Sequence, residues 1–219
     1  MTDQAGSEGS TRTAYDTVAA DYARAIQDTN QEHPLDVAMI AVFLAEVGAG
    51  PILDAGAGAG RLTGYASARG ADIRGMDLSP GMIAQARSTY PDLRFETGSL
   101  LDLPYPAGSF DGVLLWYSVI HLGDDELGRA LSEVARVTRP GGYLLLASQA
   151  GSGEVDLRPV YARMGHQVSL TRHRRTAEVL AAALARVGAR ELARLVRRGS
   201  PTHERDDQAV ILARFGPPE

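Results

Sequence analysis

Near the start of the chain, apolar residues recur at steps of three and four, which is the spacing of one face of a helix. Two segments carry this pattern, and Pro34 near the start of the second and Gly48 after its end fit the boundaries of a helix. We therefore predict two helices that form a helical cap over residues 12–48. Their apolar positions are Tyr15, Val18, Ala19, Tyr22, Ala23 and Ile26 in the first, and Leu35, Ala38, Met39, Val42, Phe43 and Val47 in the second.

From residue 51 onward, short apolar runs alternate with segments of helical periodicity. This alternation predicts a parallel sheet with helices on both of its faces. The run at 110–117 is almost wholly apolar, as expected of a strand that is buried on both sides. Asp124 or Asp125 is expected to cap the helix that follows. The predicted strands cover 51–55, 71–77, 93–97, 110–117 and 143–148, and the predicted helices cover 61–69, 80–90 and 124–138.

The end of the chain has a different order. A predicted helix over 176–187 is followed by strands over 191–196 and 209–215, which a short loop joins and which must therefore pair antiparallel. The expected fold class is α/β, a seven-stranded, mostly parallel sheet whose last strand is antiparallel. Residues 150–175 form a polar, irregular insertion that we expect to be a lid facing the substrate.

The length of 219 residues, with 44% of them hydrophobic, suits one domain with a substantial core, expected over 12–219. Residues 1–11 are polar and rich in Gly and Ser, so they are expected to form a disordered tail. They lack the apolar centre of a signal peptide, and no apolar run approaches the ~20 residues of a membrane span. We therefore expect a soluble, cytoplasmic protein with no membrane partner.

Charge and residue usage exclude several classes of chemistry. A net charge of −5 gives no basic surface for nucleic acid. The absence of cysteine excludes disulfides, thiolate nucleophiles and Cys-ligated zinc. All 22 basic residues are arginine, so no lysine can form a Schiff base or serve a P-loop. This arginine-only, alanine-rich composition is typical of a GC-rich genome such as an actinobacterial one.

A glycine-rich loop carries the first sign of function. In Ile52-Leu-Asp-Ala-Gly-Ala-Gly-Ala-Gly-Arg61 a strand leads into three alternate glycines and then a helix. Glycine lets the backbone turn sharply and lets a ligand come close, and a helix N-terminus favours an anion. The dinucleotide pattern G-x-G-x-x-G is not completed, because Arg61 or Thr63 stands where it requires glycine. A tight turn without a ligand is the simpler alternative.

Asp77 carries the second sign. It ends the second strand, 21 residues after Gly56, where a carboxylate can accept hydrogen bonds from both ribose hydroxyls of an adenosine. The alternative role is an N-cap for the next helix, which Ser79 fills more naturally.

Two further motifs make the pattern specific, namely Gly98-Ser-Leu-Leu-Asp-Leu-Pro-Tyr-Pro-Ala-Gly-Ser-Phe-Asp111 with Trp116-Tyr-Ser-Val-Ile-His121 after it, and Arg139-Pro-Gly-Gly-Tyr-Leu-Leu-Leu146. With these motifs in this order, the chain resembles the class I S-adenosylmethionine-dependent methyltransferases, in particular the small type-11 family, over roughly residues 13–215. The resemblance implies a Rossmann-like fold, S-adenosylmethionine as cofactor, S-adenosylhomocysteine as product, and transfer of a methyl group to a small-molecule acceptor by in-line displacement.

The resemblance also implies roles for individual residues. Three glycines would wrap the methionine part of the cofactor, Asp54 would orient their loop, and Asp77 would hold the ribose. Many relatives have aspartate where this chain has Ser99, which changes the contact to the adenine edge. The implied cofactor residues are Tyr15, Tyr22, Asp54, Gly56, Gly58, Gly60, Asp77, Leu78, Met82, Ser99, Leu100, Trp116 and Ser118. For Tyr15 and Tyr22, plain helix packing is an equal alternative.

Residues for the acceptor are read from position and type. His121, just beyond the fourth strand, is the best-placed general base, ahead of His33, His166 and His173. Aromatic side chains suit a planar acceptor, and arginines suit an anionic one, although a solvated charge run explains the arginines too. The candidate acceptor residues are Tyr117, Tyr161, His166, His173, Arg174 and Arg175. No metal is expected, because helix capping explains the acidic residues after His121.

Two other functions remain as alternatives. An NAD(P)-dependent oxidoreductase would share the fold, but the lack of lysine counts against its common short-chain form. A non-catalytic binding module with the cofactor fold would bind the cofactor weakly or show no turnover. The insertion and the helical cap favour a small acceptor over a macromolecule, and we expect a monomer or a homodimer.

Overall fold

The computed structural model describes residues 4–26, 29, 32–200 and 204–216, with side chains from residue 8 onward. Its centre is a seven-stranded sheet in the order β3-β2-β1-β4-β5-β9-β8, in which β9 runs antiparallel to both of its neighbours and the other pairs are parallel. This confirms the predicted fold class. The strands are β1 Ile52–Ala55, β2 Ile73–Asp77, β3 Phe95–Thr97, β4 Phe110–Trp116, β5 Thr138–Ala150, β8 Ala189–Arg197 and β9 Asp207–Phe215.

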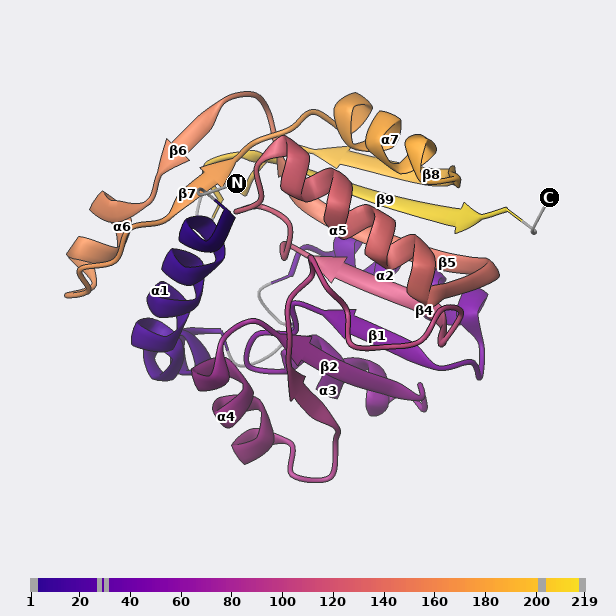
Figure 1. Ribbon diagram of the computed structural model, residues 1–219, viewed down its shortest axis with the longest axis horizontal. Coiled ribbons are helices and arrows are strands. Elements are labelled where there is room, and N and C mark those ends of the chain that lie inside the picture. The colour runs from indigo at the N-terminus through magenta and orange to yellow at the C-terminus, as the bar shows by residue number, and fades with distance from the viewer. Residues whose placement is uncertain (1–3, 27–28, 30–31, 201–203, 217–219) are drawn as a thin grey trace.

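Helices cover both faces of this sheet (Figure 1). On one face α5 and α7 pack against the strands, and on the other face α2 and α3 do so. The helices are α1 Gln4–Ala25, α2 Pro34–Val47, α3 Arg61–Ser67, α4 Pro80–Thr89, α5 Asp124–Val137, α6 Arg158–Arg163 and α7 Ala177–Arg186. None of the described helices is long and apolar enough to cross a membrane.

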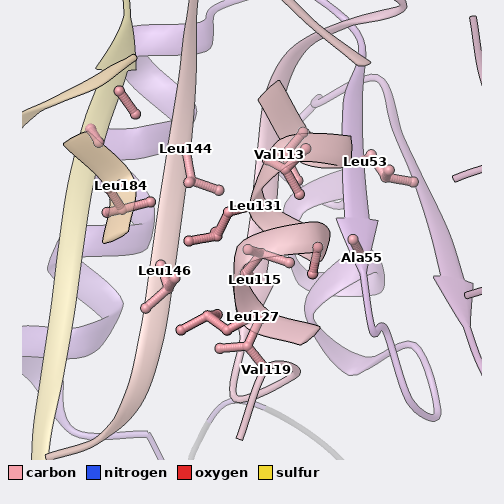
Figure 2. Close-up of a cluster of buried hydrophobic side chains, with 14 of the residues drawn as sticks. Leu53, Ala55, Val113, Leu115, Val119, Leu127, Leu131, Leu144, Leu146 and Leu184 are labelled. Carbon is pink, nitrogen blue, oxygen red and sulfur yellow. The ribbon is translucent and has the colours of Figure 1, made fainter. Parts of the chain in front are cut away.

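The apolar strand β4 holds the two layers of core together, because every one of its residues is buried. Figure 2 shows Leu127 and Leu131 of α5 lying against Leu144 and Leu146 of β5. On the opposite face Phe43 and Val47 of α2 come so close to Gly112 that a Cβ there would lie 2.6 Å from a Val47 methyl carbon. The strand therefore tolerates a glycine where the helix needs the space.

The disordered tail predicted over 1–11 is wrong for the described part of it, since α1 begins at Gln4, and residues 1–3 lie outside the described residues. Thr13 Oγ1 donates to the Gly9 carbonyl at 2.9 Å, and the Ser99 hydroxyl donates to the Glu8 carboxylate. Glycine and serine favour helix poorly. Tertiary contacts outweigh that preference here.

The predicted irregular insertion also has regular structure. Strands β6 (Glu154–Asp156) and β7 (Thr171–His173) pair antiparallel, and α6 follows β6 and precedes β7 along the chain. Leu157, Val168 and Leu170 are buried against Ala14 and Val18 of α1. The polar average of the segment hides these three inward-facing residues. Figure 1 shows α1 beside β7 and α6 at one end of the molecule, and these elements form the cap. The second helix of the predicted cap over 12–48, α2, packs against the sheet instead.

The cap of α5 is a smaller correction. Gly123, not Asp124 or Asp125, is the N-cap, and its N–H donates to Glu126 Oε2 at 3.0 Å. Asp124 instead accepts from Arg175 Nε at 3.0 Å. Ser79, in contrast, caps α4 as expected, accepting from Met82 N at 3.0 Å.

A buried ion pair ties α2 to β8. Asp36 is fully buried and accepts from Arg197 Nε at 2.9 Å, while Arg197 also pairs with Glu204, whose side chain is 25% exposed. Both carboxylates raise the pKa of Arg197, so its charge is fixed. The fold therefore depends on keeping this buried cation paired.

We expect Asp36→Ala to lower the free energy of unfolding by about 3–5 kcal/mol, because it leaves part of a buried guanidinium without its partner. Urea denaturation followed by circular dichroism measures the loss. Glu204→Ala is the matched control on the same guanidinium and should cost less, because water reaches its side chain. Equal losses would show that burial does not set the contribution.

Candidate active site

A cavity of about 740 Å³ opens at the carboxyl ends of the parallel strands. It lies where the strand order reverses, with β2 on one side of β1 and β4 on the other. In open α/β sheets this reversal leaves a crevice in which ligands bind. The cap covers the crevice, since α1, α6 and β7 all contribute lining residues.

The glycine-rich loop between β1 and α3 forms one wall. Gly56, Gly58 and Gly60 have φ values of 87°, 55° and 83°, which side chains rarely adopt. A Cβ on Gly56 would lie 2.1 Å from Ser118 Cβ, whereas a Cβ on Gly58 would meet nothing within 4 Å. Gly56 is therefore required by packing, and Gly58 faces open space at the cavity.

Asp77, at the end of β2, holds that loop in place. Its Oδ2 accepts from Gly58 N at 2.8 Å and its Oδ1 accepts from Ser79 N at 2.9 Å. Burial raises the pKa of Asp77, and these backbone hydrogen bonds oppose the rise. The carboxylate also lines the cavity, so it joins the loop, the start of α4 and any ligand between them.

Asp54, at the start of the glycine-rich loop, does not line the main cavity. It is buried and accepts from Thr63 Oγ1 at 2.7 Å, which fixes the first turns of α3. Burial raises its pKa to about 6. Asp54 lines only a small hollow, and this hollow shares Gly56, Gly58 and Arg61 with the main cavity.

Arg61, the first residue of α3, lines the cavity beside the glycines. Its Nη2 lies 2.5 Å from Glu32 Oε1, which also accepts from Trp116 Nε1 at 3.3 Å. Its Nη1 is buried and has no hydrogen-bond partner among the described residues. A buried N–H donor without an acceptor is costly, so this end of the cavity suits an anion.

His121 follows β4 and faces the cap. Its Nδ1 lies 2.7 Å from the Thr171 carbonyl, which fixes the proton on Nδ1 and leaves Nε2 to accept from the Tyr15 hydroxyl at 2.8 Å. Burial lowers the pKa of His121, so the imidazole is neutral near pH 7. Burial also raises the pKa of Tyr15, which keeps its phenol protonated.

The structure brings together most of the residues that the sequence singles out. The remaining cofactor candidates, Asp54, Gly60 and Ser99, lie just outside the lining. A Cβ on Gly60 would lie 2.7 Å from the Phe95 ring, so packing requires that glycine. Those that line the cavity are Tyr15, Tyr22, Gly56, Gly58, Asp77, Leu78, Met82, Leu100, Trp116, Tyr117, Ser118, His121 and Tyr161.

Four acceptor candidates do not line the cavity and bind other protein groups instead, which corrects that part of the prediction. His166 Nε2 lies 2.7 Å from Asp21, and His173 Nδ1 lies 3.3 Å from Glu154. Arg174 pairs with Asp206 at 3.1 Å, and Arg175 donates to the Leu122 carbonyl at 2.6 Å. A run of charged residues gives no sign of which side chains turn inward.

His33, another candidate base, accepts from Leu35 N at 3.2 Å and caps α2. Several lining residues were not singled out, because their partners come from distant segments. Only Arg61 carried a local signal, as the residue directly after the third glycine. The missed lining residues include Glu8, Glu32, Arg61, Gln149, Arg172, Asp206 and Gln208.

Comparison with known proteins identifies the part of the chain that carries the glycine-rich loop. Residues 52–142 match the family model described as a methyltransferase domain. A demethylmenaquinone methyltransferase of Beutenbergia cavernae is 38% identical over 96 residues, which are 44% of this chain and 39% of the relative. A malonyl-[acyl-carrier protein] O-methyltransferase of Pseudescherichia vulneris is 28% identical over 158 residues, 71% of this chain and 62% of the relative. The chain thus spans less than two thirds of these relatives.

Solved structures share the fold at lower identity. The 1,6-didemethyltoxoflavin-N1-methyltransferase of Burkholderia thailandensis, with bound S-adenosylhomocysteine, has a TM-score of 0.72 at 22% identity and covers 95% of this chain and 88% of its own. The [4+2]-cyclase SpnF has a TM-score of 0.73 at 18% identity, covering 97% of each chain.

Relatives from actinobacteria are among the sequence matches, which agrees with the arginine-only composition. The matched domain holds both the glycine-rich loop and Asp77, and it lies in the seven-stranded, mostly parallel sheet that the resemblance implies. Residues 52–142 therefore form a methyltransferase domain, and the fold around them is shared with solved S-adenosylmethionine-dependent methyltransferases.

Proposed function

We propose that this protein transfers a methyl group from S-adenosylmethionine to a small-molecule acceptor. The observation that carries the proposal is that one cavity is lined both by the glycine-rich loop with Asp77 and by aromatic residues of the cap. We further propose that it acts in the cytoplasm as a monomer or homodimer. Its net charge of −5 supports a function without a nucleic-acid partner.

The residues present fit the cofactor. The open space at Gly58 admits the methionine part, and the free Nη1 of Arg61 suits its carboxylate. Asp77 would accept from the ribose hydroxyls, with Leu78, Met82 and Leu100 at the adenine. Trp116 and Ser118 would hold the methionine end, and Tyr15 and Tyr22 would cover it from α1. Asp54 and Gly60 would support the loop.

The acceptor end of the cavity favours a ring-containing molecule. Trp116, Tyr117 and Tyr161 supply aromatic walls. Nearby, Arg172 pairs with Asp206 through its Nη2, whereas its buried Nε has no hydrogen-bond partner among the described residues. Two of the similar proteins are named for demethylmenaquinone and 1,6-didemethyltoxoflavin, and these names support a small-molecule acceptor.

When bound, S-adenosylmethionine supplies an electrophilic methyl group whose sulfonium charge disappears on transfer. An apolar, covered cavity therefore does not oppose the reaction, and positioning supplies much of the rate. Because the Tyr15 hydroxyl donates to His121 Nε2, the proton of a hydroxyl or ammonium acceptor would pass to the Tyr15 oxygen while the Tyr15 proton moves to Nε2, so His121 serves as the base through Tyr15. The carbonyl of Thr171 holds the imidazole in the tautomer this requires.

Calorimetric titration tests the class directly. We expect S-adenosylmethionine and S-adenosylhomocysteine to bind with micromolar affinity and NADH and NADPH not to bind. Asp77→Ala should weaken S-adenosylhomocysteine binding by about 1.5–3 kcal/mol, roughly 10- to 150-fold, from lost charged hydrogen bonds. Asp92→Ala, at an exposed position outside the cavity, is the control. Binding of NAD(P)H alone would replace this proposal by the oxidoreductase.

The glycines provide a second test. Gly58→Ala should lower the free energy of unfolding by about 1–2 kcal/mol, because alanine disfavours the left-handed backbone at this position, and the variant should still fold. It should bind S-adenosylhomocysteine at least tenfold more weakly, because the added methyl group occupies the ligand's space. Gly56→Ala should lower the melting temperature further, because its Cβ would overlap Ser118. If the folded Gly58→Ala variant bound S-adenosylhomocysteine with unchanged affinity, the glycine-rich loop would not be the binding site of the methionine part.

The lowered pKa of His121 predicts the pH profile of turnover. We measure kcat/KM against pH with a hydroxyl acceptor found in a small-molecule screen. The rate should fall only at pH values below 6.5, the ordinary pKa of histidine, because the imidazole of His121 stays neutral above that pH. His121→Gln should reduce kcat about 10²- to 10⁴-fold and leave S-adenosylhomocysteine affinity unchanged. His166→Gln, a histidine outside the cavity, should keep the wild-type profile. A His121→Gln enzyme with the wild-type rate would exclude the base role.

A further inference from the structure

We propose that Glu8, on α1, determines specificity for the adenine base: its carboxylate accepts a hydrogen bond from the amino group of the ring. This inference rests on the proposed function, because it requires an adenosine in the cavity. It assigns to the cap a part of cofactor recognition that is otherwise expected from the sheet.

The base must lie at the β3 end of the cavity. In the sheet Asp77 is paired with Thr97, and the next residue, Gly98, donates its N–H to the Asp77 carbonyl at 2.9 Å. A ribose held by the Asp77 side chain therefore directs its base over residues 98–100. Gly98 and Leu100 line the cavity there, and across from them so do Glu8 and Thr11.

The register of α1 places Glu8 on the cavity side. Glu8, Thr11, Tyr15, Val18 and Tyr22 recur at steps of three and four, and all five line the cavity. Glu8 thus continues the face that carries Tyr15, about two turns nearer the N-terminus.

Asp16 locks this register. Its Oδ1 accepts from Ser79 Oγ at 2.5 Å and from Gly81 N at 2.8 Å, both at the start of α4. A Cβ on Gly81 would lie 3.2 Å from Ala19 Cβ, so the two helices are in close contact. The carboxylate of Glu8 is therefore carried by a helix that is fixed against the base-binding end of the sheet.

The hydrogen bonds at Ser99 leave Glu8 as the available acceptor. The Ser99 hydroxyl donates its proton to the Glu8 carboxylate and accepts from Leu101 N at 2.9 Å. Both contacts orient Ser99 toward α1 and toward its own turn. A carboxylate has two oxygens and accepts several hydrogen bonds, so Glu8 keeps capacity for a ligand N–H after binding Ser99.

This chemistry selects adenine over its deaminated analogue. Adenine presents an amino donor on this edge, whereas hypoxanthine presents a carbonyl oxygen. A carboxylate is attracted to the first and repelled by the second. Glu8 therefore should contribute to discrimination between the two bases and not only to affinity.

Calorimetric titration with S-adenosylhomocysteine and with S-inosylhomocysteine tests this directly. Wild-type protein should bind the adenosyl ligand at least tenfold more tightly. Glu8→Ala should lose about tenfold in affinity for the adenosyl ligand and little or nothing for the inosyl ligand, so the ratio collapses. Glu8→Gln, whose amide also donates, should move the preference toward the inosyl ligand.

A rescue variant separates recognition from folding. Ser99→Asp in the Glu8→Ala background places a carboxylate on the sheet side of the same position and should restore the preference for the adenosyl ligand. Asp92→Ala is the control, and thermal unfolding checks that each variant is folded.

Equal losses for both ligands in Glu8→Ala, or no loss for either, would overturn the assignment of Glu8. Failure of wild-type protein to bind S-adenosylhomocysteine would overturn the proposed function instead. The two failures are therefore distinguishable.

Discussion

The partly buried carboxylate of Asp77 makes the contacts on which the site depends. One of its oxygens accepts from the glycine-rich loop at Gly58 and the other from Ser79 at the start of α4. Ser79 in turn donates to Asp16 of α1, so a chain of hydrogen bonds runs from the sheet to the cap. Such networks are strong only when each member is satisfied. The loop, the helix and the cap are therefore positioned as one unit.

Local sequence patterns predicted the parts of the fold that are governed by local rules. The apolar run of β4 is buried throughout, as its composition indicates, and the glycines take the positive φ values that their loop requires. The placement of His121 and Asp77 at strand ends also followed from chain order. These features depend on neighbours in sequence, so periodicity and residue type suffice.

The remaining features depend on contacts between distant residues, which a single sequence does not reveal. Glu8 lies in a stretch of poor helix formers and gains its place from Ser99, 91 residues away. Arg197 reaches Asp36 across 161 residues. The segment that contains β6, α6 and β7 is polar on average, yet three of its side chains are buried against α1. In each case tertiary contacts outweigh local preference.

The chain has one tryptophan, and its position has a practical consequence. Trp116 is 6% exposed at the base of the cavity, and its ring lies 5.6 Å from that of Tyr117 in an edge-on arrangement. All indole emission of the protein therefore originates beside the glycine-rich loop, next to the charges of Glu32 and Arg61. The molecule contains its own optical reporter of cavity occupancy, free of background from any other indole.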